Sequence, residues 1–337
     1  MRTAYEANLY GSGDAFHGAM RLREGLCRLD LPTNIPVGTV NVYIFTDEPV
    51  TLIDAGPLNE NCHAELKRQL HEVGLAPSDI ERIVLTHGHV DHSGLAETVR
   101  KESGAEVLAP EADGPMVSDY TRAFKERHER YREAALQAGA PPATVDVVMD
   151  FFEYLVTFGE PAKVTRTVGD GDEIAAGSTL LKAVHTPGHS SGSTCYLSAE
   201  GELFGGDTLL KDMTPIAAFG GADRESVGLA DYLGSLHRVR ALKPKIVHPG
   251  HRGPLDDVAA YVSDSMNRYR ARQEAILRLI QLGPITPFEI VEKLFGTLPI
   301  EEILLGVTEV LGHLEVLGRE AAVSLDDSGD VTLVRLR

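Results

Sequence analysis

Hydrophobic positions in the first third of the chain follow two alternating periods. Two stretches, Asn61 to Val73 and Ser93 to Ser103, carry apolar residues at helical spacing. Between them lie short apolar runs that end at Gly, Pro or polar residues, as strands do. The expected strands are Val40 to Phe45, Val50 to Asp54, Ile83 to Thr86 and Glu106 to Ala109. This order, β-β-α-β-α-β, predicts an α/β fold in which helices cover sheets.

The segment from about residue 115 to residue 158 has a different pattern. Aromatic side chains recur there at broadly helical intervals among charged residues, and Pro141-Pro142 interrupts them. The pattern predicts a pair of helices inserted between two strands. The pair could pack against the core or cover a substrate site, and the pattern alone leaves both open.

Strand-like runs then return, and from about Met266 the spacing becomes helical. The tetrapeptide Thr286-Pro287-Phe288-Glu289 has the features of a helix start with a capping box. A helix over Ile300 to Leu317 and a hairpin over Ala321 to Val334 are expected after it. We therefore predict a catalytic domain at 1–265, with the insertion at about 115–158, and a winged-helix-like domain at 266–337. The strands expected before Met266 are Ser178 to Val184, Ser193 to Leu197, Glu202 to Phe204 and Lys245 to His248.

Composition narrows the classes of function. The chain of 337 residues has 50 acidic and 32 basic side chains, for a net charge of −18. This charge favours solubility and repels polyanions, which counts against a general nucleic-acid binder. The sequence has no secretory h-region and no apolar run of membrane-span length, so no membrane partner is expected. Three widely spaced cysteines fit neither a disulfide framework nor a CxxC site, so we expect a reduced, cytoplasmic protein.

The strongest chemical signal is the run from Thr86 to Gly94, THGHVDHSG, directly after an expected buried strand. Imidazole nitrogens and carboxylate oxygens are ligands that Zn²⁺ accepts. His87 and His89 share one face in extended chain, so they can converge on one ion. A turn into the next helix can then direct Asp91 and His92 at a second ion.

Four further clusters place an acidic or imidazole group beside Gly or Pro at expected strand ends. Any one of them is ordinarily a simple turn, but their joint occurrence predicts that loops bring these groups to one pocket that holds two metal ions. The clusters are Asp54-Ala55-Gly56, His185-Thr186-Pro187-Gly188-His189-Ser190, Gly205-Gly206-Asp207-Thr208 and His248-Pro249-Gly250-His251.

The order of these motifs, HxHxDH, then PGH, then GD and a final GH, resembles the metallo-β-lactamase fold superfamily over roughly residues 20 to 260. The resemblance implies a four-layer αββα sandwich with the metals at one edge of the sheets. It also implies that Asp54 orients a ligand, as metal-bound histidines require. The implied ligands are His87, His89 and His189 for the first ion, Asp91, His92 and His251 for the second, and Asp207 bridging both.

The C-terminal segment, with His313-Leu314-Glu315-Val316-Leu317, resembles the winged-helix tail of the lactamase-like-2 branch. The Asp207 position argues against a true di-zinc β-lactamase, where cysteine or serine is usual. It is shared with glyoxalase-II-like thioesterases, lactonases and nucleolytic relatives. Basic C-terminal residues like those that hold glutathione in glyoxalase II have no clear equivalent here.

Two cations about 4 Å apart can share one water and lower its pKa to about 7. The resulting bridging hydroxide would attack an ester, thioester or lactone, and Asp91 would accept the proton and pass it to the leaving group. We expect Zn²⁺, with Mn²⁺ or Fe²⁺ as alternatives, because all three accept these ligands. The aromatic insertion favours a small apolar acyl substrate.

Two other functions stay open at this stage. The tail resemblance suggests an endoribonuclease or phosphodiesterase, although residues 266–337 are more acidic than basic. An iron-dependent sulfur dioxygenase is a second alternative, although such relatives use one iron and need no second ligand set.

Other residues carry weaker expectations. His185 and His248 could hydrogen-bond substrate or a carboxylate, orient a ligand, or have a purely structural role. Tyr120 and Tyr131 could contact substrate if the insertion closes over the site. The remaining histidines in helical stretches, including His313, are expected to have surface or packing roles. The aromatic helix pair and the tail are both plausible surfaces for a homodimer.

Overall fold

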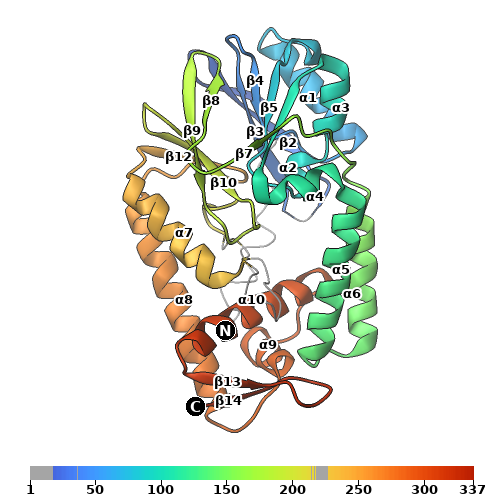
Figure 1. Ribbon diagram of the computed structural model, residues 1–337, viewed down its shortest axis with the longest axis vertical. Coiled ribbons are helices and arrows are strands. Elements are labelled where there is room, and N and C mark those ends of the chain that lie inside the picture. The colour runs from blue at the N-terminus through green and yellow to red at the C-terminus, as the bar shows by residue number, and fades with distance from the viewer. Residues whose placement is uncertain (1–17, 36, 214, 216, 218–226) are drawn as a thin grey trace.

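The computed structural model describes residues 18–35, 37–213, 215, 217 and 227–337. Two β-sheets lie face to face between helices (Figure 1). The seven-stranded sheet contains, in spatial order, β1 (Ala19–Arg23), β2 (Leu26–Pro32), β3 (Thr39–Phe45), β4 (Thr51–Ile53), β5 (Arg82–Val84), β6 (Glu106–Pro110) and β7 (Arg166–Val168). The five-stranded sheet contains β12 (Ile246–Pro249), β11 (Glu202–Gly206), β10 (Thr194–Ser198), β9 (Thr179–His185) and β8 (Glu173–Ala176).

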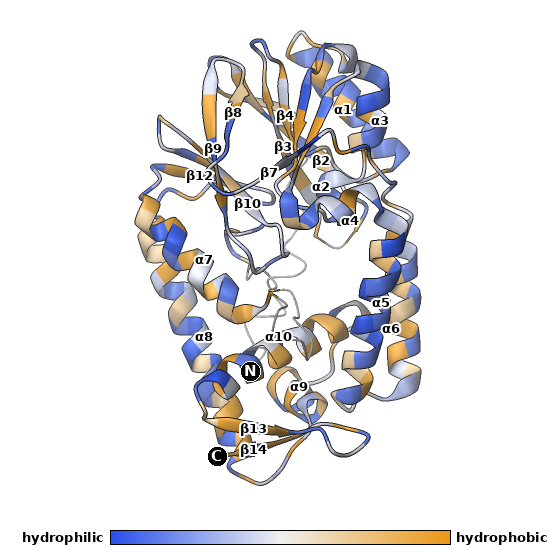
Figure 2. Cartoon of the chain, in the orientation of Figure 1, coloured by the Kyte–Doolittle hydropathy of each residue, from blue (hydrophilic) through white to orange (hydrophobic). Residues whose placement is uncertain are grey.

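Helices cover the outer face of each sheet, which makes the predicted four-layer αββα arrangement. On the first sheet lie α1 (Glu60–Glu72) and α3 (Ala96–Ser103), and on the second lie α7 (Leu229–Leu242) and α8 (Val258–Ile280). Short 3₁₀ turns span Pro77–Asp79 and Glu111–Asp113. Apolar residues line the inner faces of the sheets and helices (Figure 2).

The near-continuous apolar run of β3 is explained by burial on both faces. Successive residues of a strand point to opposite sides of the sheet. Val42 belongs to the hydrophobic cluster under α1 and α3, whereas its neighbour Tyr43 belongs to the cluster between the two sheets with Phe204. A strand in this position has no solvent face, so strict polar alternation is lost.

The predicted single helix over Ser93 to Ser103 is wrong in detail. The chain forms a short helix α2 (Val90–Ser93), and α3 begins only at Ala96, after Leu95 takes ψ near −2°. Gly94 sits at the break, where an added Cβ would lie 2.3 Å from the carbonyl oxygen of Phe158. The break lets α2 point in its own direction, and two predicted metal ligands lie on it.

The insertion consists of α4 (Gly114–Ser118), α5 (Tyr120–Gln137) and α6 (Pro142–Val156), between β6 and β7. Pro142 begins α6, which explains why the predicted pair is divided at the double proline. Near α2, Tyr120, Phe124 and Phe158 pack with Val90. The far end of the pair packs elsewhere, so the helices connect two parts of the molecule (Figure 1).

We call α9 (Pro287–Phe295), α10 (Ile300–Arg319), the hairpin β13 (Val323–Asp326) and β14 (Leu333–Leu336), and residues 266–280 of α8 the C-terminal module. These elements share their own hydrophobic cluster. The capping box is confirmed, since Thr286 Oγ1 accepts from the N–H of Glu289, and Glu289 Oε2 accepts from the N–H of Thr286. The boundary predicted after residue 265 lies inside the continuous helix α8.

The far end of the insertion is joined to this module. The N–H of Phe288 donates to the carbonyl oxygen of Ala138 at 2.8 Å, and the N–H of Thr332 donates to that of Gln137 at 2.8 Å. Met149 and Leu304 share a hydrophobic cluster across the same contact.

None of the described helices combines the length and apolarity of a membrane span. The three cysteines are buried free thiols.

Candidate metal centre

The first predicted ligand set is assembled by two loops. His87 and His89 follow β5, and His189 lies in the loop between β9 and β10. His87 Nε2 and His89 Nδ1 are 3.1 Å apart, and the His189 ring centroid lies 4.9 Å from that of His87 and 4.6 Å from that of His89. One ligand atom of each residue therefore lies within 4.8 Å of those of the other two.

The second predicted set combines α2 with the loop after β12. Asp91 and His92 lie on α2, and His251 follows β12. Asp91 Oδ2 lies 3.3 Å from His251 Nε2 and 3.9 Å from His92 Nε2. These three residues again place their ligand atoms within 4.8 Å of one another.

Asp207, directly after β11, lies between the two sets. Its Oδ1 is 3.3 Å from His92 Nε2, and its Oδ2 is 3.5 Å from both His189 Nε2 and His251 Nε2. One carboxylate thus reaches histidines of both sets. This is the position required of a residue that would bridge two cations.

Several of these polar atoms are buried without a hydrogen-bond partner in the described part of the chain. They are His92 Nε2, His251 Nε2 and Asp207 Oδ1. Buried polar groups are ordinarily satisfied, and a ligand that the protein atoms lack is one explanation when they are not. Nitrogen and oxygen donors that converge in this way fit a divalent transition metal.

Electrostatics inside the cluster favours bound cations. Burial alone would raise the pKa of Asp207, but His251, His92 and His189 hold it well below its usual range. The pKa of Asp91 is also lowered, because His92 and His251 outweigh the effect of its burial. Both carboxylates are therefore ionised and concentrate negative charge where the histidine nitrogens point.

The histidines of the two sets differ in proton affinity. Burial and the neighbouring rings of His92 and His189 lower the pKa of His87 well below its usual value. Burial alone would also lower the pKa of His92, but Asp207, Asp54 and Asp91 together raise it well above that value. The carboxylates therefore raise the pKa of His92 in the second set, but they do not offset the lowering of the pKa of His87 in the first.

Asp54 makes the ligand-orienting contact expected of it. Its Oδ2 accepts from His92 Nδ1 at 2.8 Å, and its Oδ1 accepts from the N–H of Thr86 at 2.8 Å. Asp54 has φ of 61°, a left-handed conformation that turns the chain sharply after β4. The carboxylate therefore links the His87 loop to α2 and holds His92 with Nε2 toward the cluster.

Two further supports carry no signal in the sequence motifs. His251 Nδ1 donates to the carbonyl oxygen of Thr39 at 2.6 Å, so a main-chain group on β3 fixes that ring. Asp113, fully buried, accepts from the N–H of Gly88 at 2.8 Å, from the N–H of Gly192 at 2.7 Å and from Ser190 Oγ at 2.7 Å. Asp113 thus ties the loop of His87 and His89 to the loop of His189.

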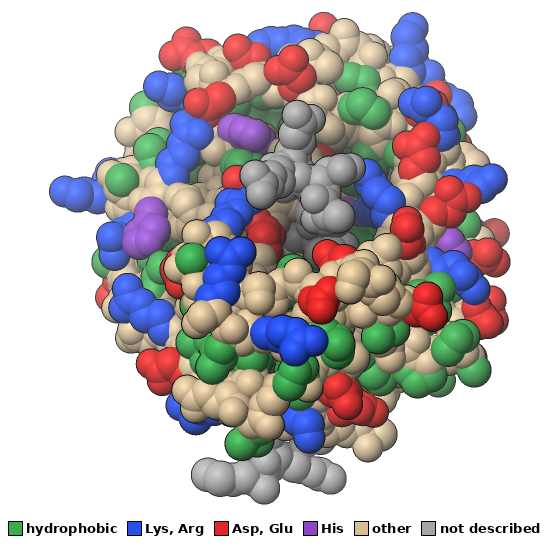
Figure 3. Space-filling view, turned by 60° about the horizontal axis from the view of Figure 1, so that its bottom comes forward, with side chains coloured by type: hydrophobic (Ala, Val, Ile, Leu, Met, Phe, Trp, Pro, Cys, Tyr) green, Lys and Arg blue, Asp and Glu red, His purple; other side chains and the backbone are tan. Residues whose placement is uncertain are grey.

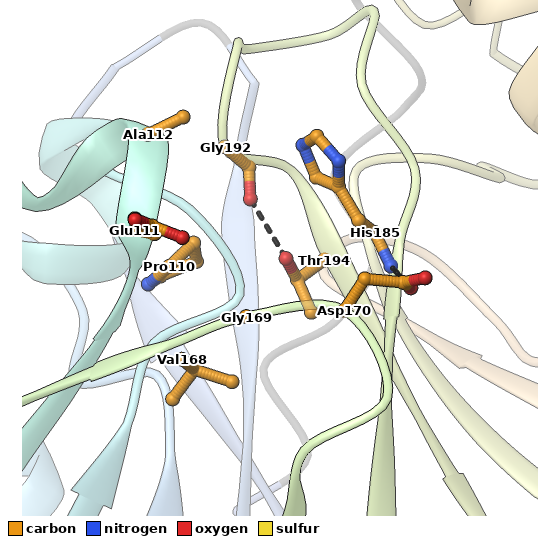
Figure 4. Close-up of a pocket in the computed structure, with 9 residues that line it drawn as sticks. All are labelled: Pro110, Glu111, Ala112, Val168, Gly169, Asp170, His185, Gly192 and Thr194. Carbon is orange, nitrogen blue, oxygen red and sulfur yellow. Dashed lines mark hydrogen bonds between the residues drawn. The ribbon is translucent and has the colours of Figure 1, made fainter.

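The four weaker substrate candidates lie in different places. His185 Nε2 contacts the carbonyl oxygen of Ser191 at 2.9 Å, and its side chain lines a separate small cavity with Glu111 and Asp170 (Figure 4). His248 is buried among aromatic rings between the sheets, with Nε2 3.5 Å from Glu202 Oε1.

The two tyrosines belong to opposite ends of the insertion. The hydroxyl of Tyr120 donates to the carbonyl oxygen of Val156 at 3.1 Å, and its ring packs in the cluster beside α2. Tyr131 packs with Phe152 in the cluster against α10. Of the four candidates, Tyr120 alone lies in a cluster that contacts a helix carrying ligands.

Two β-sheets lie between helices, and histidines and aspartates that could hold metal ions gather where several strands end. This arrangement is typical of a metal-binding α/β protein. The chain belongs to the metallo-beta-lactamase superfamily, whose model matches residues 35–251. This confirms the predicted family and fold. Membership also supports a hydrolase with a site for divalent metal ions.

Similar proteins agree with this assignment. The chain is 31% identical to "Probable metallo-hydrolase YqjP" of Bacillus subtilis, over 89% of this chain and 94% of that protein. A solved metallo-beta-lactamase family protein of Thermus thermophilus is 29% identical with a TM-score of 0.81, covering 94% of this chain and all of that one. "Atrochrysone carboxyl ACP thioesterase" of Aspergillus fumigatus is 29% identical over 42% of this chain and 46% of that protein.

Proposed function

We propose that the protein is a hydrolase that uses two divalent metal ions, Zn²⁺ in the first instance, to cleave an ester or thioester of a small acyl substrate. The observation that carries the proposal is the position of Asp207. Its two oxygens lie 3.3 Å from His92 Nε2 and 3.5 Å from His189 Nε2, so one carboxylate serves both ligand sets. Under this proposal the first ion is held by His87, His89 and His189, and the second by Asp91, His92 and His251.

When bound, the two ions would supply an activated water and polarise the acyl oxygen. The chain contributes the proton transfer. Asp91 is ionised, and its side chain is 14% exposed whereas that of His251 beside it is fully buried. Asp91 therefore faces the solvent side, where it can accept a proton from the attacking water and deliver it to the leaving group.

Three observations support an acyl substrate. The buried cluster of Tyr120, Phe124, Phe158 and Val90 makes the surroundings of α2 apolar. A relative that is 29% identical over part of its length is named a thioesterase of an acyl carrier protein. The net charge of −18 counts against a polyanionic substrate, although Figure 3 shows several Lys and Arg side chains next to one another on one face. A lactone fits the same chemistry.

The test is elemental analysis combined with a substrate panel. We expect about two metal equivalents per chain and turnover of p-nitrophenyl esters or acyl thioesters that a chelator abolishes and added Zn²⁺ restores. Single-stranded RNA and a persulfide with oxygen-uptake measurement complete the panel. Preferred cleavage of RNA, or oxygen uptake with about one iron per chain, would contradict the proposal.

A further inference from the structure

Arg127 on α5 lies close to the first ligand set without belonging to it. Its Nη1 is 3.7 Å from Met116 Sδ, on α4. Met116 in turn packs against Gly88, where an added Cβ would lie 3.0 Å from the same sulfur. Gly88 separates His87 from His89, so a single side chain lies between the guanidinium and the backbone of two predicted ligands.

The guanidinium is held in place but has no acidic partner. It is half-buried, and its Cζ lies 5.6 Å from the centroid of the Phe124 ring. Among the described residues no carboxylate forms an ion pair with it, and the Met116 sulfur is its one hydrogen-bond partner. A sulfur is a weak acceptor for a group with five N–H donors.

Three other cations of the same helix have an acidic partner: Arg122, Lys125 and Arg132. Arg130 has no ion pair among the described residues, but it is exposed to water. Arg127 therefore differs from the other cations of α5 in being half-buried without an acidic partner. This difference is not a result of scarce acids, since the chain has a net charge of −18.

The positive charge of Arg127 lies one side chain away from the backbone of the loop that holds His87 and His89. A half-buried cation near a place for two more cations is costly unless an anion joins them. Aligned N–H donors of arginine match carboxylate and phosphate oxygens in geometry as well as in charge.

We propose that Arg127 binds an anionic group of the substrate, a carboxylate or a phosphate, and so selects charged acyl compounds over neutral ones. The proposal rests on the proposed hydrolase function and adds the substrate class. It differs from the expectation of an apolar acyl substrate by adding a negative charge, which Arg127 binds.

Matched substrates separate the two sources of negative charge. Mono-p-nitrophenyl glutarate against p-nitrophenyl butyrate tests a carboxylate on the acyl part, and butyryl-4′-phosphopantetheine against butyryl-pantetheine tests a phosphate on the leaving group. We expect the wild-type protein to prefer the charged member of at least one pair by about 10-fold or more in kcat/KM. No preference in either pair overturns the proposal.

Variants then assign the preference to the side chain. Arg127→Gln should lower the charged-to-neutral ratio by about 10-fold, and Arg127→Lys should lower it less, because lysine keeps the charge but not the fork of donors. Arg130→Gln is the matched control, the same change at an exposed position of α5. Equal effects of Arg127→Gln and Arg130→Gln, or an unchanged ratio in Arg127→Gln, would refute the assignment.

A binding measurement distinguishes failure of this inference from failure of the proposed function. Calorimetric titration of the metal-loaded protein with glutarate and with inorganic phosphate should show binding of one of them about 10-fold weaker in Arg127→Gln than in Arg130→Gln. If that difference is found but no ester or thioester is cleaved, the anion site stands and the hydrolase proposal fails. If esters are cleaved but the two variants bind both anions alike, the hydrolase proposal stands and the anion site fails.

Discussion

Histidine rings are buried both at the sheet edge and in the C-terminal module, but their surroundings differ. In the metal-ligand cluster, His92 Nδ1 contacts Asp54, and His251 Nδ1 contacts the carbonyl oxygen of Thr39. In the C-terminal module, His313 on α10 is fully buried, and neither of its ring nitrogens has a hydrogen-bond partner in the described chain. Its nearest aromatic neighbour is Tyr269, with ring centroids 5.8 Å apart.

The difference distinguishes a histidine of a candidate metal site from one that only packs in a hydrophobic core. At the sheet edge one nitrogen of a ring is fixed by the protein and the other is directed at a shared centre, an arrangement that metal-binding histidines require. His313 merely fills space, and its burial, together with the charge of Arg272, lowers its pKa to about 3. A buried histidine therefore indicates a ligand only when its two nitrogens have different environments.

The largest effect is expected from a change to Asp207, whose carboxylate reaches both ligand sets. Asp207→Asn removes the charge that reaches both ligand sets, so we expect a fall in kcat/KM of about 1,000-fold and the loss of about one metal equivalent per chain. Steady-state kinetics with elemental analysis measures both. Thermal unfolding serves as the control for folding, and near-normal turnover by the variant would show that Asp207 does not bridge.

A smaller effect is expected from the residue that orients His92. Asp54→Asn keeps the size of the side chain but removes the negative charge that accepts from His92 Nδ1, so affinity for the second metal ion should fall about 10- to 100-fold. Competition with a chelator of known affinity gives the two dissociation constants. If only the first set loses affinity, our assignment of Asp54 to the second set is wrong.

Asp113 offers a test of the loops rather than the ligands. Asn would present an amide N–H₂ where Asp113 accepts from Gly88, Gly192 and Ser190, which leaves a buried donor unpaired and costs about 1–3 kcal/mol of stability. Chemical denaturation of Asp113→Asn measures this. Glu111→Gln, at an exposed position two residues away, is the matched control and should have little effect. Equal stabilities of the two variants would contradict the role of Asp113.

The smallest expected effect is on the pH dependence of the unfolding free energy, and it comes from His313 in the C-terminal module. The folded pKa of His313 is about 3, below its ordinary value of about 6.5, so the unfolded chain takes up the proton first as the pH falls. The stabilisation is complete above about pH 6.5 and is lost progressively toward pH 3. Between pH 7 and pH 5 the wild-type protein should lose about 2 kcal/mol more unfolding free energy than His313→Leu.

Urea unfolding of both proteins at the two pH values measures this difference, and the titration of other groups cancels in the comparison. His313→Leu should leave hydrolysis unchanged, unlike the three changes at the sheet edge. An equal pH dependence in the two proteins would show that His313 takes up its proton as readily in the folded as in the unfolded state.

Much of the metal-ligand cluster could be predicted because its residues are marked by local motifs. His87, His89, Asp91 and His92 lie within six consecutive residues after a strand, and each of the other three ligands, His189, Asp207 and His251, directly follows a Gly. Apolar runs of strand and helix length predicted sheets covered by helices, and the four-layer sandwich was implied by the resemblance to the metallo-β-lactamase superfamily. The break at Gly94 and the unbroken α8 were missed, because each depends on a distant contact or on helix continuity rather than on local spacing.

The supports were harder to predict than the ligands. His251 and Thr39 are 212 residues apart, and the partner is a main-chain carbonyl, which any residue type supplies. Asp113 is one acidic residue among 50 and has no flanking histidine. His248 stands three residues before His251 but contacts the Glu202 carboxylate between the sheets, because strand geometry and not sequence distance decides which way it faces. A contact with a carboxylate and a structural role were among the alternatives that the sequence left open for it.

The inserted helices link two places that a shorter loop would leave independent. One end packs on Val90, next to the ligands of α2, and the other end is bonded through Ala138 and Gln137 to the C-terminal module. The helix pair therefore extends from α2 to the C-terminal module, which lies outside the two-sheet sandwich. An engineer who transplants this insertion into another member of the superfamily has to transfer the C-terminal module with it, or the end beside α2 loses the support of the other end.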